Sequence, residues 1–141
     1  MTPDNADIHA KQLIGRKLLS IEMKDYSWLL EFDAGASLVT ESPWRLIEQG
    51  RIAVSSGDHG QQFGLTAPMN AARAVMSRVG GRTVEAASIA SDSGDLMLEF
   101  QGRTCLQLLQ LSSGYEAWRL SIDGNESICM GGGNIAHFPR S

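Results

Sequence analysis

The sequence carries one pattern twice, and this repeat constrains the fold more than any other feature. The segment LLEFDAGASL at 29–38 matches MLEFQGRTCL at 97–106, and PWRL at 43–46 matches AWRL at 117–120. Two copies are too few for a solenoid, which needs at least three short units to bury a core. The repeat instead predicts one motif used twice, as two related β-meanders of a single domain.

Both copies have the pattern of strands. Apolar and polar residues alternate as in half-buried strands, and Ala34-Gly35 can link two such runs as a hairpin. The copies are expected to cover about residues 15–54 and 81–130. The expected strands are 16–24, 27–33, 36–41, 43–47, 51–56, 82–91, 95–100, 104–111, 115–122 and 126–130.

The strongest helical pattern lies between the two copies, at residues 67–79. Thr66 can cap this helix, and the glycines that begin at Gly80 can end it. Residues 7–14 suit either a short helix or an extended lead-in. The expected fold is therefore α+β and mostly β: an antiparallel sheet or partial barrel of two related β-meanders with one central helix, in a single domain over residues 1–141.

Charge and composition argue against nucleic acid and membranes as direct partners. The formal net charge is −4, and the 12 Lys and Arg residues are scattered singly, which argues against nucleic acid as a direct partner. No apolar run approaches the roughly 20 residues that span a bilayer, and the N-terminus lacks the basic-then-apolar pattern of a signal peptide. We therefore expect a cytoplasmic protein without membrane contact, in which Cys105 and Cys129 are reduced core residues.

The titratable residues do not suggest a catalytic or metal centre. His9, His59 and His137 lie in three different contexts without metal-ligand spacing, and there is no C-x-x-C. Glu31 and Glu99 occupy equivalent repeat positions and could in principle form an acid/base pair. Because they alternate with apolar residues, they are better interpreted as the solvent side of two strands. No enzyme activity, cofactor or metal is expected.

The three tryptophans differ in context. Trp44 and Trp118 occupy equivalent repeat positions, which favours a shared packing role in the core. Trp28 follows polar residues at a strand entry and is the better candidate for exposure at an interface.

The second copy resembles a family of small bacterial domains. The run GDLMLEFQGRTCLQL, then GYEAWRLS and then CMGGGNIAHF, resembles the family's recurring strand, hairpin, Tyr-Glu-x-Trp and Gly-Gly elements. These elements fall on Gly94, Leu96, Phe100, Gly102, Tyr115, Glu116, Trp118, Gly132 and Gly133. The first copy matches more loosely, through Leu30, Phe32, Gly35, Leu38 and Pro43.

Members of such families resemble immunity proteins of polymorphic-toxin and contact-dependent growth inhibition systems. The resemblance implies a cytoplasmic antidote that binds a cognate toxin domain, often a nuclease, and blocks its active site. It supplies no catalytic residues. A mildly acidic protein is complementary to the basic surface of such a toxin.

Candidate toxin-binding residues lie where the two copies differ. These segments are residues 22–28, the polar loop at 57–64 and the turn at 91–95. The candidates are Glu22, Asp25, Tyr26, Trp28, Asp58, His59 and Asp92. Asp58 is also expected to bond its own backbone in a turn.

The alternative function is a small-molecule-binding or enzymatic β-barrel-like domain of unknown substrate. Its pocket would lie between the two meanders and be lined by Met23, Trp44 and Trp118. A plain scaffold or dimerisation domain is a third possibility.

Overall fold

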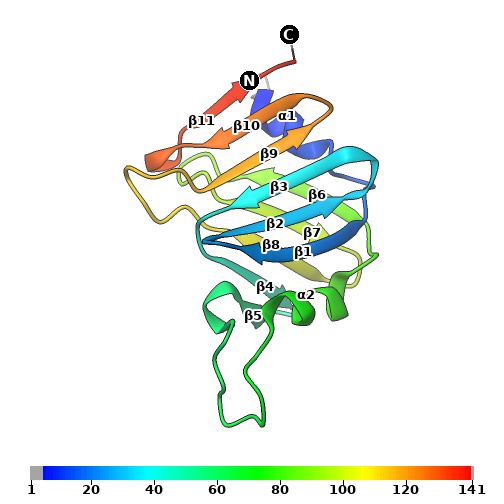
Figure 1. Ribbon diagram of the computed structural model, residues 1–141. Coiled ribbons are helices and arrows are strands. Elements are labelled where there is room, and N and C mark those ends of the chain that lie inside the picture. The colour runs from blue at the N-terminus through cyan, green and yellow to red at the C-terminus, as the bar shows by residue number, and fades with distance from the viewer. Residues whose placement is uncertain (1–4, 141) are drawn as a thin grey trace.

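A computed structural model describes residues 5–140, and it consists mainly of two packed antiparallel sheets (Figure 1). The six-stranded sheet has the order β1-β2-β3-β9-β10-β11, and the five-stranded sheet has the order β5-β4-β8-β7-β6. The strands are β1 (Leu18–Lys24), β2 (Ser27–Phe32), β3 (Ala36–Thr40), β4 (Trp44–Glu48), β5 (Arg51–Ser55), β6 (Val84–Ile89), β7 (Leu96–Phe100), β8 (Thr104–Leu108), β9 (Trp118–Ile122), β10 (Asn125–Cys129) and β11 (Ile135–Phe138). The expected antiparallel, mostly β fold is confirmed, as two open sheets rather than one sheet or a closed barrel.

The two repeat copies exchange strands between the sheets. The first copy places β1, β2 and β3 in the six-stranded sheet and β4 and β5 in the other. The second copy places β6, β7 and β8 in the five-stranded sheet and β9 and β10 in the other. Consequently β3 pairs with β9, and β8 pairs with β4, in equivalent registers. Each sheet is therefore completed by a hairpin from the other copy.

A pseudo-two-fold axis relates the copies and passes between Lys17 and Thr83. These two residues form an isolated antiparallel bridge. Around them, Leu18 N–H donates to the Arg82 carbonyl at 3.3 Å, and Val84 N–H donates to the Arg16 carbonyl at 2.9 Å. β1 and β6 also carry β-bulges at equivalent positions. Matching bulges and reciprocal hydrogen bonds indicate one structural unit used twice.

The two helices also correspond to each other. α1 (Asn5–Lys11) precedes β1, and α2 (Ala71–Val79) precedes β6. Each packs across the axis, α1 against β6 and α2 against β1. The helix α2 is therefore the first element of the second copy and not a separator between copies. The short N-terminal helix that the sequence left open is present.

The expected start of the central helix at residue 67 is wrong. Asn70 is the N-cap, and its side-chain oxygen accepts from Arg73 N at 3.0 Å. The preceding Met69 is held in an extended pairing, because its N–H donates to the Gln61 carbonyl at 2.8 Å. Met69 matched the helical spacing by coincidence, and Thr66 lies in a loop.

The core lies between the sheets and includes all three tryptophans. Trp44 and Trp118 are each 1% exposed, as expected from their equivalent positions. Trp28 is only 5% exposed, so the tryptophan that was the better candidate for exposure also belongs to the core. Its ring packs edge-on against Trp44 at 5.1 Å, and against His59 at 5.3 Å, between ring centroids. Trp28 follows polar residues in the sequence, but Trp44 and His59, which are distant in the sequence, cover it.

Candidate functional site

One end of the two-sheet core gathers most of the sequence-predicted candidates. In the six-stranded sheet, Trp28 and Trp118 both lie opposite Thr40, at the same end of their strands. The Trp28–Trp44 contact joins this end to the five-stranded sheet, and Trp118 Nε1–H donates to the Gly94 carbonyl at 2.9 Å. We call this end the loop end. It comprises residues 24–27, 41–43, 56–59, 90–95, 109–117 and 130–134.

The opposite end, here the turn end, is formed by the short connections. It comprises residues 15–17, 33–35, 49–50, 80–83, 101–103 and 123–124. Two of its connections, at Gln49-Gly50 and Asp123-Gly124, have positive φ at both residues, as tight hairpin turns require. The turn end is therefore built for compact strand reversal.

Charge differs between the two ends. The acidic residues of the loop end are Asp25, Glu41, Asp58, Asp92, Asp95 and Glu116, and its basic residue is Lys24. The turn end has Arg16, Lys17, Arg82 and Arg103 against Asp33 and Asp123. The net negative charge of the chain is thus concentrated at the loop end, where it can attract a basic partner.

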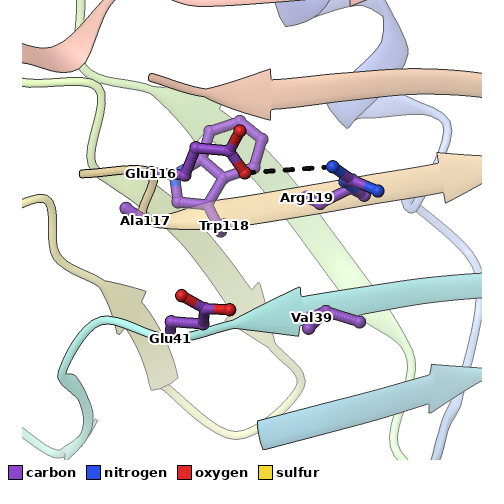
Figure 2. A pocket seen from close by; sticks show the side chains of 6 residues that line it. All are labelled: Val39, Glu41, Glu116, Ala117, Trp118 and Arg119. Carbon is purple, nitrogen blue, oxygen red and sulfur yellow. Dashed lines mark ion pairs between the residues drawn. The ribbon is translucent and has the colours of Figure 1, made fainter. Parts of the chain in front are cut away.

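A groove of about 240 Å³ lies at the loop end, beside β3 and β9 (Figure 2). Its lining residues are Val39, Glu41, Glu116, Ala117, Trp118 and Arg119. Arg119 Nη2 lies 3.8 Å from Glu116 Oε2. The two side chains are about half exposed, at 48% and 50%. Such an exposed pair is weak and can exchange partners. The groove therefore offers two carboxylates, and a cationic side chain of a partner can replace Arg119 beside Glu116.

The 109–117 loop, which carries Glu116, is held by hydrogen bonds within the loop and to Met130. Gln110 Nε2 donates to the Tyr115 carbonyl at 2.9 Å and to the Met130 carbonyl at 2.8 Å. Tyr115 N–H donates to Ser112 Oγ at 2.9 Å. The side chain of Tyr115 is nevertheless 82% exposed. A fixed backbone that presents an exposed aromatic residue favours recognition, because little ordering entropy is lost on binding.

The structure brings the predicted candidates to three loops of this end. Asp25 and Tyr26 lie at the β1–β2 connection, where Tyr26 is 90% exposed, whereas Glu22 is exposed within β1. Asp92 is exposed at the β6–β7 turn. Trp28 is the exception, because a core residue does not offer its ring to a partner.

Asp58 and His59 are partly exposed and have structural contacts of their own. Asp58 Oδ2 accepts from Ser55 N at 2.9 Å, so its expected turn role is confirmed. His59 Nδ1 accepts from Ala71 N at 3.1 Å and so ties this loop to the start of α2.

The sequence did not point to Glu41 or Tyr115 as candidates for contact. Residues 115–122 were expected to form a strand, but β9 begins at Trp118. The polar turn residues Ser112, Ser113 and Gly114 were the signal for a longer loop.

The pocket expected from Met23, Trp44 and Trp118 is also wrong. Met23 is 47% exposed at the end of an edge strand, whereas both tryptophans lie in the core. The groove of Figure 2 shares only Trp118 with that set.

Reactive groups are scarce in residues 5–140. This part of the chain has no group of three or more His, Cys, Asp or Glu side chains that could hold a metal ion. Both cysteines are free, and burial raises the pKa of Cys129 to about 11 and also raises the pKa of Cys105. A thiol with a raised pKa is mostly protonated at neutral pH and is a poor nucleophile. None of the helices in the described range is long and apolar enough to cross a membrane.

Comparison with known proteins identifies a family. The model of a family described as "Family of unknown function (DUF6188)" matches residues 9–139. No curated protein and no solved structure matches the chain. The match covers both repeat copies, and its description names no toxin or immunity protein.

Proposed function

The chain belongs to the DUF6188 family of unknown function, and we propose that it is an immunity protein that binds a cognate toxin domain and blocks its active site. The observation that carries the proposal is the concentration of acidic residues at the loop end. A toxin that acts on nucleic acid presents a basic surface, and opposite charge both steers and orients the encounter. The proposed place of action is the cytoplasm, where such a toxin would find its substrate.

Two exposed tyrosines at the loop end add apolar contact area to the acidic residues. Tyr26 and Tyr115 are 90% and 82% exposed. Tyrosine combines a large apolar ring with a hydroxyl group and is enriched among residues that dominate binding energy. Binding would therefore combine charge steering by the carboxylates with anchoring by the two rings.

The alternative of a small-molecule-binding or enzymatic domain has less support. Ligand pockets usually enclose roughly 300 to 1,000 Å³. The groove beside β3 and β9 is smaller, at about 240 Å³, and lies on the surface of the sheet. Its size suits one side chain of a larger partner better than a whole ligand.

Co-expression tests the proposal. The toxin domain encoded beside this chain's gene should arrest growth when expressed alone, and co-expression of this protein should restore growth and yield a stable complex. The triple variant Glu41→Gln, Asp92→Asn, Glu116→Gln should slow association by about tenfold or more at low salt, because it removes three loop-end charges. Stopped-flow association at two salt concentrations measures this effect.

The matched control removes the same number of negative charges from residues outside the loop end. Glu31, Glu85 and Glu99 are exposed strand residues outside the loop end. The triple Gln variant at these positions should associate nearly as fast as the wild type. Equal slowing in both triple variants would show that the loop end is not the binding surface. Absence of both growth rescue and complex would refute the proposed function itself.

A further inference from the structure

The pseudo-two-fold axis reveals a sheet edge that lacks its counterpart. β10 and β5 are equivalent strands. β10 pairs with β9 on one side and with β11 on the other. Within residues 5–140, β5 pairs with β4 alone and forms the border of its sheet. An edge that accepts an antiparallel strand in one copy is therefore open in the other.

The segment that could have filled this edge projects away from it. After β10, the chain passes through the 3₁₀ turn Gly131–Gly133 and returns as β11. After β5, it passes through the equivalent turn Ser56–Asp58 and then forms residues 60–69, which we call the finger. In Figure 1 the finger extends well beyond β5 and α2.

The finger has an organised base and an apolar tip. Gly60 N–H donates to the Met69 carbonyl, and Met69 N–H donates to the Gln61 carbonyl, both at 2.8 Å. Phe63 has a φ of 46° and is 63% exposed, and Leu65 is 51% exposed. No residue of the finger is charged. An uncharged projection with exposed apolar residues indicates a contact surface.

In the described part of the chain, the open edge has no covering strand and no proline or lysine, and its blocking features are the charge of Arg51 and a β-bulge. β5 reads Arg-Ile-Ala-Val-Ser, with no proline or lysine, and Ile52 is 58% exposed. The bulge lies on β5 itself, where Ala53 has no partner on β4. Natural edge strands are usually blocked by charge, proline or a covering element, because unpaired N–H and C=O groups recruit other strands.

The charges at the two ends of β5 complement each other. Arg51 is exposed at the start of the strand. At its end, Asp58 Oδ2 accepts from Ser55 N at 2.9 Å, which fixes a carboxylate beside the last residue. An antiparallel arrangement of two β5 strands about a central two-fold axis brings Arg51 of each copy beside Asp58 of the other. A second copy of the chain therefore complements this edge in charge, and its β5 can pair with the backbone groups that Asp58 does not occupy.

We propose that the protein forms a homodimer in which the β5 edges of two copies pair antiparallel and join the two five-stranded sheets. The finger of each copy then extends over the other and covers Phe63 and Leu65. The helix α2 does not obstruct this pairing, because α1 holds the equivalent position beside β10 and β11. The inference does not depend on the proposed function and concerns the chain alone.

Sedimentation and light scattering of the purified chain test the proposal. The wild type should have twice the mass of the 15.3 kDa chain and dissociate on dilution. Ile52→Lys should weaken dimerisation at least about tenfold, because it places two cations at the strand pair. Arg51→Glu should weaken it similarly, because the new carboxylate faces Asp58.

The matched control is Leu19→Lys on β1, the border strand of the six-stranded sheet. Leu19 is 55% exposed on β1, close to the exposure of Ile52. This variant should remain dimeric, and circular dichroism should show that all three variants are folded. A wild type that stays monomeric up to about 0.5 mM, or a dimer that survives Ile52→Lys, overturns the proposal. Loss of the dimer in Leu19→Lys alone would assign the interface to β1 and also overturn it.

Discussion

Replacing Gly94 with alanine is expected to lower the free energy of unfolding by about 3 kcal/mol. Gly94 has a φ of +77°, where a β-carbon is strained. An added Cβ would also lie 2.6 Å from the Gly133 carbonyl oxygen and 2.8 Å from Cys129 Sγ. The first contact is with backbone, so the β6–β7 turn would have to move away from the Gly131–Gly133 turn. Urea unfolding followed by circular dichroism measures the loss.

Gly35→Ala separates the steric part of this loss from the dihedral part. Gly35 has a similar φ of +80°, but an added Cβ would have no atom within 4 Å. Gly35→Ala should therefore lower the free energy of unfolding by only about 1 kcal/mol, which is the cost of the left-handed conformation alone. Equal losses in the two variants would contradict the close approach of the two turns.

This contact explains much of the motif pattern in the second copy. Gly94 accepts a hydrogen bond from Trp118 Nε1 through its carbonyl and packs against Gly133. Glycine, tryptophan and the Gly-Gly pair therefore form one interlocked group at the loop end. They are needed for backbone approach and core packing, so this part of the pattern describes the fold and identifies no chemistry.

Local patterning predicted the strands well but not their partners. Glu31 and Glu99 face solvent as their alternation with apolar residues predicted. The exchange of hairpins between the sheets was not predictable from the repeat. Equivalence between two copies says nothing about whether β3 pairs with its own copy or with β9 of the other. That choice depends on burying the inner faces of both sheets together, which is a non-local property.

The candidate site was predicted in part for the same reason. Turn residues marked the β1–β2 and β6–β7 connections, so Asp25, Tyr26 and Asp92 were placed correctly in exposed loops. Glu41 lies beside Glu116 only because β3 pairs with β9. Trp28 was misplaced because its cover comes from Trp44, which is distant in sequence.

A buried histidine on α1 makes the stability of the protein sensitive to pH. His9 is 2% exposed, and its Nδ1 lies 2.7 Å from Ser127 Oγ. The same oxygen lies 2.8 Å from His137 Nδ1, and the two imidazole centroids are 5.0 Å apart. The hydroxyl has one proton, so it donates to one ring and accepts from the other. His9 Nε2 is buried without a hydrogen-bond partner in the described part of the chain, and protonation would bury an N–H there.

The free energy of unfolding should therefore fall as the pH is lowered below 6.5. Burial lowers the pKa of His9 from 6.5, and His137 lowers it further. The other charged side chains of α1, Asp7 and Lys11, pair with each other at 3.1 Å. Above pH 6.5 the imidazole is neutral in the folded and unfolded states. Below it, the unfolded chain takes up the proton first, so stability is lost at up to about 1.4 kcal/mol per pH unit until the lower folded-state pKa is reached.

His9→Val should remove this loss, and the second copy supplies the model for the substitution. Val75 occupies the equivalent position on α2 and is fully buried. Near pH 7.5 the variant should stay within about 1 kcal/mol of the wild type, because Ser127 keeps its hydrogen bond to His137. Between about pH 7 and 5 its urea midpoint should change less than that of the wild type. An unchanged slope in His9→Val would mean that another group binds the proton, whereas a flattened slope would identify the contact between α1 and β10 as the part of the fold that acid weakens first.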